Sequence, residues 1–306
     1  MASAGARVPR LVLVGLGALG GSSAVLLLRP GQKPAAPAES GQPDGAAPPL
    51  VSYSAPDRFS GGIAQPTTKW DFNWDQRAPT SLVEPPKGLS ETELKEHASY
   101  QESLGKAKAR ARRHLILIRH GQYRLDGATD EHRVLTELGR QQAALTGAQL
   151  RRLGLPYTAI IRSSMARALE TSDIIQRELA EAAPPVSTSD LLREGAPIPP
   201  EPRLRHWQPG PRRFFEDGPR IEAAFRRFVH RAAPDQERDS YEIVVCHANV
   251  IRYFVCRALQ LPPEAWLRFS LRHASLTWLT VLPNGRVKLD FMGDAGFMPP
   301  DAMTTT

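Results

Sequence analysis

The chain has 306 residues, with 39 Lys and Arg against 32 Asp and Glu, and a formal net charge of +7. Apolar residues make up 41% and charged residues 23%, which excludes a wholly disordered, collagenous or polytopic membrane chain. The basic excess lies entirely in residues 100–306, where 30 Lys and Arg face 23 Asp and Glu, and most of them are Arg. Because guanidinium groups bind phosphate and carboxylate bidentately, this bias favours a phosphate-bearing partner.

The first long apolar stretch covers residues 11–28, LVLVGLGALGGSSAVLLL, and follows a basic leader at residues 1–10. As a helix it would span roughly 27 Å, which is enough to cross a bilayer. No acidic residue precedes Glu39, as is typical of mitochondrial targeting segments, so we expect one transmembrane helix in a mitochondrial membrane. A secretory signal is the competing interpretation. Because basic residues flank this helix on both sides, their distribution does not decide its orientation in the membrane. The choice of outer or inner membrane and the cleavage of the anchor are also left open by the sequence.

Residues 29–89 are rich in Pro, Ala, Gly and Ser and are predicted to form a linker. One aromatic motif interrupts it, Trp70-Asp71-Phe72-Asn73-Trp74-Asp75. In an extended strand the three aromatic rings would share one face and the polar side chains the other. Such a face needs a surface to pack against, and the chain's own domain and a neighbouring copy are both open as that surface.

A basic helical segment is expected at residues 90–112, before the region where regular strand and helix patterns begin. Short, unbroken apolar runs are typical of strands covered on both faces, and they lie at residues 115–118, 159–161 and 243–246. Amphipathic helices are predicted between and after them, at residues 136–153, 165–179, 219–231 and 249–259.

A hairpin around Asn284-Gly285 is predicted to close this region, because strand-like runs flank that turn dipeptide. Strands that alternate with helices predict a three-layer α/β/α sandwich with a mainly parallel central sheet at residues 113–300, followed by a tail at 301–306. The two cysteines, Cys246 and Cys256, lack the spacing of a metal site and are predicted to be buried thiols.

Polar residues cluster where the predicted strands end. Arg119 and His120 follow the first strand, Arg167 lies shortly after the second, and His247 follows the strand that ends at Cys246. In open α/β sheets, ligands bind at the carboxyl ends of the strands, where helix N-termini also offer N–H groups to anions. Two arginines and two histidines at that edge predict a phosphate pocket.

Four sequence blocks stand in order along this region: Arg119-His120-Gly121, residues 163–171 (SSMARALET), residues 191–195 (LLREG) and residues 246–249 (CHAN). With these blocks, residues 113–300 resemble the histidine phosphatase superfamily, in its phosphoglycerate-mutase branch. The apolar stretch at 11–28, the aromatic motif and the closing residues 296–300 (GFMPP) narrow the resemblance to the membrane-anchored mitochondrial serine/threonine phosphatases of that branch.

The resemblance implies a phosphoglycerate-mutase-like fold with His120 as nucleophile and Glu194 as proton donor. It also implies that the phosphoryl group is bound by Arg119, Arg167 and His247. These roles are chemically coherent, because a neutral imidazole can attack phosphorus and cationic side chains can spread the charge of the phosphoryl oxygens. Such a site needs neither a metal ion nor a cofactor, and we expect none.

Two neighbours of these residues affect the assignments. Arg193 would oppose a raised pKa of Glu194 unless its side chain points away. Asn249 either donates a hydrogen bond in the site or caps the following helix, and the cap is favoured.

The favoured function is a metal-independent protein phosphatase that hydrolyses phosphoserine and phosphothreonine in protein substrates through phosphohistidine. By resemblance, the motif at residues 70–75 promotes assembly into a homo-oligomer and activates it. A phosphoglycerate-mutase-like enzyme or small-molecule phosphatase is the alternative, although the short domain leaves little chain for a lid that would exclude water. A mainly scaffolding membrane protein is the third hypothesis, and no motif predicts nucleic-acid binding.

Overall fold

The computed structural model describes residues 59–60, 63–64 and 68–305. The strands β1 (Phe59–Ser60) and β2 (Ile63–Ala64) pair antiparallel and belong to a separate unit from the residues that follow Pro66. The predicted leader and transmembrane helix at residues 1–28 lie outside the described residues. Among the helices that are described, none has the length and apolar character needed to cross a membrane.

A six-stranded mixed sheet forms the centre of the fold, in the order β5-β4-β6-β3-β7-β8. The first four of these strands are parallel, and β7 and β8 are added antiparallel at one edge. The prediction of a mainly parallel sheet is therefore correct for the four strands that precede the hairpin. The strands are β3 (Arg113–Arg119), β4 (Tyr157–Ser163), β5 (Val186–Ser189), β6 (Ser240–Cys246), β7 (Leu276–Val281) and β8 (Val287–Asp294).

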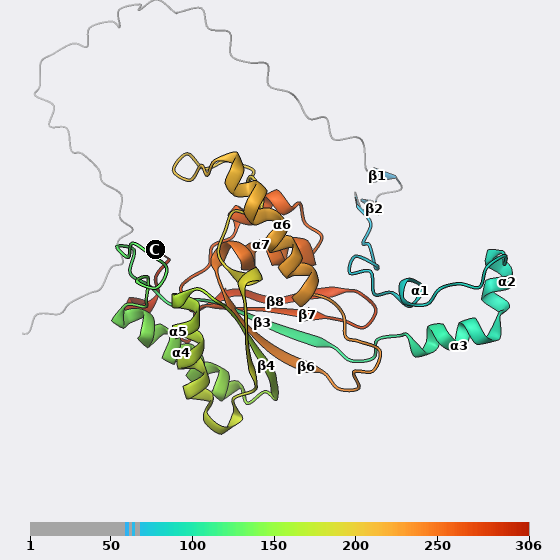
Figure 1. The fold of residues 1–306 in the computed structure, drawn as a ribbon, viewed down its shortest axis with the longest axis horizontal. Helices are drawn as coiled ribbons and strands as arrows, with labels where there is room; N and C mark the ends of the chain where they lie inside the picture. The colour runs from blue at the N-terminus through green and yellow to red at the C-terminus, as the bar shows by residue number, and fades with distance from the viewer. Residues whose placement is uncertain (1–58, 61–62, 65–67, 306) are drawn as a thin grey trace, which may run out of the picture. The chain divides into compact units, whose positions relative to one another are not determined.

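Helices cover both faces of this sheet, as Figure 1 shows. Alternate side chains of β3 point to opposite faces, because side chains in a strand alternate with a period of two. Leu115 and Leu117 pack in the core on the side of α6 and α7, whereas Ile116 and Ile118 pack on the side of α4 and α5. The three layers are therefore those predicted. The helices are α4 (Glu137–Leu153), α5 (Ala166–Leu179), α6 (Pro211–Phe228) and α7 (Ala248–Ala258).

Local signals explain where these helices begin and end. The Thr136 hydroxyl accepts a hydrogen bond from the Gly139 N–H at the start of α4, and Gly154 ends that helix in the left-handed conformation. The predicted start of α6 at Pro219 is wrong, because the helix begins at Pro211 and continues through Pro219. Pro211 occupies the first helical position, where a missing N–H costs nothing.

Sequence patterns did not indicate the edge strand β5, which is short and has no buried residue. In the described part of the chain, 3-10 helices lie between or after the larger elements, at η1 (Ala180–Ala182), η2 (Asp190–Leu192), η3 (Pro263–Arg268) and η4 (Pro300–Ala302). The hairpin predicted at Asn284-Gly285 is confirmed, since β7 and β8 pair around it and Gly285 has φ +83°.

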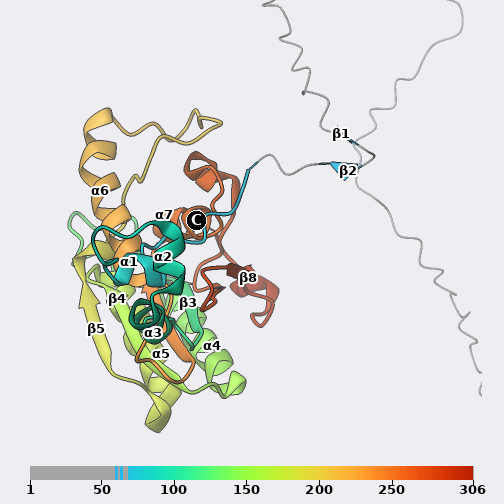
Figure 2. The ribbon, with the colours of Figure 1, turned by 90° about the vertical axis from the view of Figure 1, so that its right-hand side faces the viewer.

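Three short helices precede the sheet, and Figure 2 shows them together: α1 (Pro79–Leu82), α2 (Glu91–Glu96) and α3 (Ala98–Lys106). Ser90 and Glu93 form a reciprocal capping box at the start of α2. In these three helices only Tyr100 is buried. The expected basic helical segment is thus helical up to Lys106 and irregular after it.

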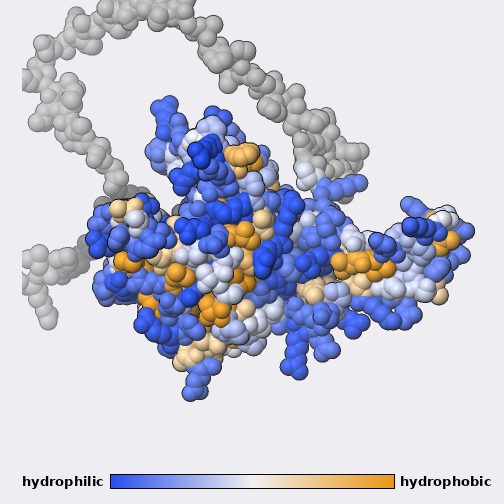
Figure 3. Space-filling model, viewed as in Figure 1, coloured by the Kyte–Doolittle hydropathy of each residue, from blue (hydrophilic) through white to orange (hydrophobic). Residues whose placement is uncertain are grey.

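The Arg excess lies largely on the surface. In the view of Figure 3 the surface over α6 is mostly hydrophilic, whereas apolar residues reach the surface nearer to α4 and α5. The outer face of α6 carries four exposed arginines, Arg212, Arg213, Arg226 and Arg227.

Candidate active site

Four predicted site residues meet at the carboxyl edge of the parallel strands. β3 ends at Arg119 and is followed by His120, and β6 ends at Cys246 and is followed by His247. Because Arg119 pairs with Cys246 in register, the two histidines leave the sheet side by side, with ring centroids 5.1 Å apart. Arg167 lies in the first turn of α5, and its Nε atom is 3.3 Å from Nε2 of His120.

His120 is buried and neutral in this site. Burial lowers its pKa well below the ordinary value, and the nearby His247, Arg167 and Arg119 lower it further. Its Nδ1 atom lies 2.8 Å from the carbonyl oxygen of Gly121. Because a carbonyl oxygen can only accept, Nδ1 carries the proton and the lone pair is on Nε2. The nitrogen with the lone pair is therefore the one that faces Arg167.

Asp130 binds the arginine that faces His120. Its Oδ1 atom accepts a hydrogen bond from Nη1 of Arg167 at 3.2 Å, and its Oδ2 atom accepts one from the N–H of Ala166 at 3.1 Å. The guanidinium of Arg167 also lies over the ring of Tyr123, 4.6 Å from its centroid. A guanidinium beside a helix N-terminus is a favourable place for an anion. Asp130 therefore contacts donors that would suit a phosphoryl group.

Arg119 is mostly enclosed by protein. Burial lowers its pKa to about 10. Its Nη1 atom donates to the carbonyl oxygens of Leu271 at 2.7 Å and Thr305 at 3.0 Å, and its Nη2 atom lies 3.0 Å from Nε2 of His273. Its Nε–H is buried and finds no hydrogen-bond partner within the described part of the chain. A buried donor without a partner is costly unless a ligand completes it.

His247 also has a ring nitrogen without a partner. Its Nε2 atom lies 2.8 Å from the hydroxyl oxygen of Ser163, whereas its Nδ1 atom is buried and unpaired among the described residues. Burial lowers the pKa of His247 well below the ordinary value, and Arg167 and Arg119 add to the shift. The ring is thus neutral here. A bound phosphate dianion would favour the protonated form.

The carboxyl group of Glu194 has the environment of a proton donor. Burial raises its pKa, although the Gly195 N–H, 3.1 Å from Oε1, and the charge of Arg167 act in the opposite direction. The side chain of Arg193 points elsewhere, since its Nη1 atom donates to the Ser164 hydroxyl at 3.2 Å. The objection that Arg193 would stabilise the carboxylate therefore does not apply.

Two residues of α6 hold the loop that carries Glu194. Arg220 donates from Nη1 to the carbonyl oxygen of Arg193 at 2.6 Å and from Nη2 to that of Glu194 at 3.2 Å. Asp217 pairs with Arg220 at 2.8 Å and accepts a hydrogen bond from the Ala196 N–H at 2.9 Å. The backbone on both sides of Glu194 is therefore fixed to one helix.

Asn249 supports the same loop from α7. Its Nδ2 atom donates to the carbonyl oxygen of Gly195 at 3.0 Å. The N-cap of α7 is His247, and Asn249 lies within the first turn, so the expectation that Asn249 caps this helix is wrong. The side chain is occupied by a long-range contact that the sequence does not display.

Sequence reasoning missed the polar residues that support the predicted site. They come from loops or from the middle of a helix, where no strand-end pattern marks them. Only the i, i+3 spacing of Asp217 and Arg220 on α6 is a pattern that the sequence itself displays. The missed residues are Asp130, Tyr123, Asp217, Arg220 and His273.

The arrangement combines a neutral imidazole, an arginine that donates to it, a second arginine with an unpaired N–H among the described residues, and a carboxyl group with a raised pKa. These groups can attack a phosphorus atom, bind its oxygens and protonate a leaving oxygen. Within the described residues, His, Cys, Asp and Glu form no group of three or more that could hold a metal ion.

The aromatic motif at residues 70–75 forms a turn. Asp71 Oδ1 accepts a hydrogen bond from the Asn73 N–H at 2.7 Å, and the Gln76 N–H donates to the Asn73 carbonyl oxygen at 2.9 Å. Asp and Asn commonly close the backbone in this way. The expectation of an extended strand with three aromatic rings on one face is therefore wrong.

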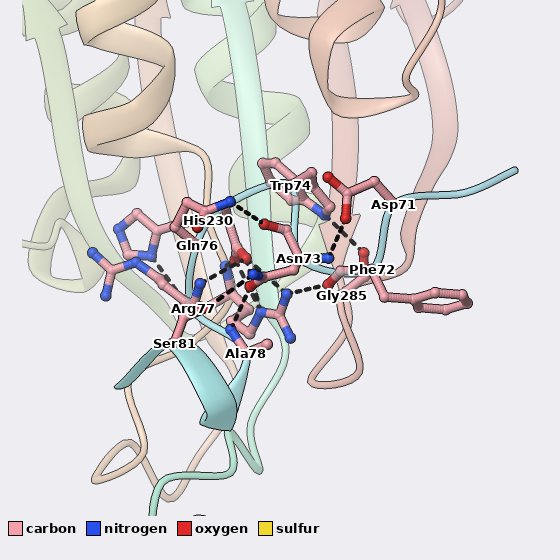
Figure 4. A network of polar contacts seen from close by, with 12 residues as sticks. Asp71, Phe72, Asn73, Trp74, Gln76, Arg77, Ala78, Ser81, His230 and Gly285 are labelled. Carbon is pink, nitrogen blue, oxygen red and sulfur yellow. Dashed lines mark hydrogen bonds and ion pairs between the residues drawn. The ribbon is translucent and has the colours of Figure 1, made fainter. Parts of the chain in front are cut away.

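Two of the three rings pack onto the chain's own domain. The indole N–H groups of Trp70 and Trp74 both donate to the carbonyl oxygen of Gly285, at 3.2 and 2.8 Å, and the Trp74 ring lies 5.7 Å from that of Phe225. Figure 4 shows the ring of Phe72 pointing away from this network, and that side chain is 54% exposed. Phe72 therefore remains available to another surface.

Asp75 anchors the motif to Arg231. Its carboxylate accepts hydrogen bonds from the Arg231 backbone N–H at 2.9 Å and from Nη2 at 2.7 Å. Both side chains are almost inaccessible, at 1% for Asp75 and 4% for Arg231. Burial alone would raise the pKa of Asp75, but the hydrogen bonds and charge of Arg231 lower it. The carboxylate is thus ionised and paired.

Comparison with known proteins places these features in a family. The profile of the histidine phosphatase superfamily (branch 1) matches residues 115–294. A mitochondrial serine/threonine-protein phosphatase PGAM5 of Homo sapiens is 51% identical over 294 residues, which cover 96% of this chain and 97% of the relative. The protein of the same name from Xenopus laevis is 56% identical over 245 residues, covering 80% of this chain and 87% of the relative.

Among solved structures, a phosphoglycerate mutase from Plasmodium falciparum is 30% identical. The superposition covers 60% of this chain and 92% of the mutase chain, with a TM-score of 0.43.

Proposed function

The chain belongs to the histidine phosphatase superfamily, branch 1, and we propose from this premise that it dephosphorylates proteins through a phosphohistidine at His120. As an enzyme it is a serine/threonine-protein phosphatase, the activity for which relatives about half identical in sequence are named. The observation that carries the proposed mechanism is the neutral His120, which keeps a lone pair on the Nε2 atom that faces Arg167.

In the first step Nε2 of His120 attacks phosphorus, so that an N–P bond forms while the bond from phosphorus to the Ser or Thr oxygen breaks. The hydrogen bond from Nδ1–H to the Gly121 carbonyl oxygen stabilises the imidazole ring as it gains positive charge. Arg119 and Arg167 bind the equatorial oxygens, and protonated Glu194 gives its proton to the leaving oxygen. The products are a neutral hydroxyl group, phosphohistidine and ionised Glu194.

In the second step the Glu194 carboxylate removes a proton from a water molecule. The water oxygen bonds to phosphorus as the N–P bond breaks, which releases inorganic phosphate and returns His120 to its neutral form. Glu194 is then protonated for the next cycle. A raised pKa supports both roles, because the group must exchange a proton near working pH.

We also propose that the chain is tethered to a mitochondrial membrane through residues 11–28, which lie outside the described residues. The uncharged run and the acid-free leader support this, and the relatives are named mitochondrial. A fluorescent fusion of the full chain should sediment with mitochondrial membranes and resist extraction by alkaline carbonate. Complete extraction would contradict the tether.

Self-assembly through residues 70–75 is the third part of the proposal. Phe72 supports it, because a ring that is 54% exposed beside a well-anchored turn can pack against a second copy. Sedimentation of the full chain should give an oligomer, and the double variant Trp70→Ala/Trp74→Ala should sediment as a smaller species with lower activity. An unchanged sedimentation coefficient would contradict a role in assembly.

The proposed chemistry is tested with the full chain and His120→Ala on phosphoserine, phosphothreonine and phosphotyrosine peptides and on 3-phosphoglycerate. We expect phosphate release from the first two peptides, an acid-labile phosphoprotein after rapid quenching, and neither signal with His120→Ala. The exposed His206→Ala serves as the matched control. Undiminished turnover by His120→Ala would overturn the mechanism, and isomerisation of 3-phosphoglycerate would favour a mutase instead.

A further inference from the structure

Some N–H donors of the Arg119 guanidinium bind other protein groups, and the others have no protein partner among the described residues. A guanidinium group has five N–H donors, and both on Nη1 are taken by the carbonyl oxygens of Leu271 and Thr305. One donor on Nη2 points to His273, and the buried Nε–H has no partner among the described residues. The edge formed by Nε and Nη2 therefore keeps two donors for the phosphoryl group.

His273 can hold this arrangement only in one protonation state. Its Nε2 atom lies 3.0 Å from Nη2 of Arg119, and an arginine can only donate, so Nε2 must carry a lone pair. Burial lowers the pKa of His273 to about 3, and the charge of Arg119 contributes, which agrees with a neutral ring. Its remaining proton is then on Nδ1.

That proton points to the end of the chain. Nδ1 of His273 lies 2.8 Å from the hydroxyl oxygen of Thr304, and the His273 N–H donates to the Thr304 carbonyl oxygen at 2.8 Å. Gln142 of α4 donates from Nε2 to the same Thr304 hydroxyl oxygen at 2.9 Å and to the Ala302 carbonyl oxygen at 2.7 Å. The last described residues are thus fixed to a helix on one side and to His273 on the other.

We propose that His273 and Thr304 are positioning residues for Arg119, and that the C-terminal residues 302–305 form part of the wall of the phosphate site. The inference rests on the proposed function, because it gives Arg119 a phosphoryl group to bind. The ring of His273 lies beside that of His120, with centroids 5.8 Å apart, but the hydrogen bonds of the His120 ring go to Gly121 and Arg167. His273 and Thr304 act by orienting the guanidinium so that its Nε and Nη2 edge faces the pocket before the substrate arrives.

Pre-orientation matters here because the arginine must meet charge that develops on the phosphoryl oxygens. Donors that are already in place cost no reorganisation at the moment of reaction, and small displacements of such groups cost rate steeply. A long arginine side chain without His273 would keep only the two carbonyl contacts of Nη1. Those contacts hold only the Nη1 end of the guanidinium, and the Nη2 end loses its contact with His273.

The test compares Thr304→Val, which removes the hydroxyl acceptor, with Thr304→Ser, which keeps it. In the full chain we expect Thr304→Val to lower kcat on a phosphothreonine peptide about tenfold and to weaken inorganic phosphate binding by calorimetry about threefold, with KM changing less than kcat. Thr304→Ser should stay within about twofold of wild type in both. Thr188→Val is the matched control, because the Thr188 hydroxyl accepts from Arg162 away from the site.

A second pair of variants covers the case in which Thr304→Val unfolds, as thermal denaturation would show. His273→Gln keeps an acceptor near the position of Nε2 and should retain most activity, whereas His273→Leu should behave like Thr304→Val. Wild-type kcat and phosphate affinity in Thr304→Val or His273→Leu would overturn the proposal, as would equal losses in Thr304→Ser or Thr188→Val. If wild type showed no turnover, the proposed function would fail, but phosphate binding would still decide whether Arg119 is positioned in this way.

Discussion

Two buried arginine sites of this protein differ in how completely their donors are paired. Arg231 gives hydrogen bonds to both oxygens of Asp75 and to the carbonyl oxygen of Phe72. Arg119 leaves its Nε–H without a partner in the part of the chain that the structure describes, and its pKa is lowered to about 10 by burial. The first arginine joins two segments of the chain, whereas under the proposed function a bound anion would complete the second.

This difference in hydrogen bonding distinguishes a structural arginine, Arg231, from an arginine of the proposed site, Arg119, without reference to sequence motifs. A buried ion pair strongly resists the loss of one partner, because the remaining charge stays buried. A buried guanidinium with free donors and two neutral histidines beside it is unfavourable by itself and becomes favourable with a phosphoryl dianion. The proposed phosphate site would therefore carry a cost that a bound phosphoryl group relieves, whereas the Arg231 donors that face Asp75 are already paired.

The largest expected effect is on the structural arginine. Arg231→Met should lower the free energy of unfolding by about 3–5 kcal/mol, because Asp75 would be left buried and ionised without its partner. Denaturant unfolding followed by tryptophan fluorescence measures this. The double variant Arg231→Met/Asp75→Leu should recover part of the loss, and a single variant as stable as wild type would contradict the comparison.

Arg167→Met should have the opposite effects on the protein, a large loss of activity with little loss of stability. We expect kcat to fall about 10²–10³-fold, because a donor to the transition-state charge is lost, while stability stays close to that of wild type. Steady-state turnover of a phosphothreonine peptide and thermal denaturation together check both parts. A variant that loses stability as strongly as Arg231→Met would show that Arg167 is also a structural residue.

The two regions should also respond to different pH ranges. His120, His247 and His273 are buried with lowered pKa values, so below about pH 6.5 the unfolded chain binds more protons and the folded chain loses up to ~1.4 kcal/mol per histidine per pH unit. Glu194 has a raised pKa and opposes this trend above its ordinary range. The pair of Asp75 with Arg231 weakens only as pH falls through the lowered pKa of Asp75.

Denaturant unfolding between pH 7.5 and pH 5 checks this prediction. Stability should fall toward pH 5 in wild type, and the slope should be smaller in His247→Asn. Saturating inorganic phosphate should also reduce the slope, because the anion favours the protonated histidines. A flat profile over this range would contradict the buried, neutral state of these rings.

Asp130→Asn tests how an internal carboxylate competes with phosphate. Asp130 contacts Arg167 and the first turn of α5, so removing its charge should tighten inorganic phosphate binding by about threefold, or ~0.7 kcal/mol. Calorimetry of the full chain measures the change, with Asp126→Asn in the same loop as control. Weaker binding by Asp130→Asn would mean that the carboxylate orients Arg167 instead of competing for it.

The smallest effect is expected at Phe72. Because its side chain is 54% exposed, Phe72→Ala should change the free energy of unfolding by less than ~0.5 kcal/mol, in contrast to the anchored Trp74. Sedimentation should nevertheless show weaker assembly if this ring packs against a second copy. A large loss of stability would place the ring inside the fold, and unchanged assembly would exclude it from the interface.

Strong local patterns made much of the fold predictable. The runs at residues 115–118 and 243–246 became central strands, and α4 covers Glu137–Leu153 against the predicted residues 136–153. Elements without such patterns were missed or misplaced. The edge strand β5 buries no residue, and α6 was predicted to start at Pro219, which lies inside the helix that begins at Pro211. The aromatic motif was also misread, since side-chain hydrogen bonds to the backbone replaced the extended strand.

The sequence by itself determined that Arg119, His120 and His247 stand at strand ends. The apolar runs before them are typical of strands buried on both faces of a sheet, so the polar residues that follow mark where each strand stops. Only the tertiary structure decided which nitrogen of His120 carries the proton, where Arg193 points and which donors of Arg119 stay free. Those properties depend on partners far away in the chain, such as Thr305 for Arg119, and on burial that exists only after the layers have packed.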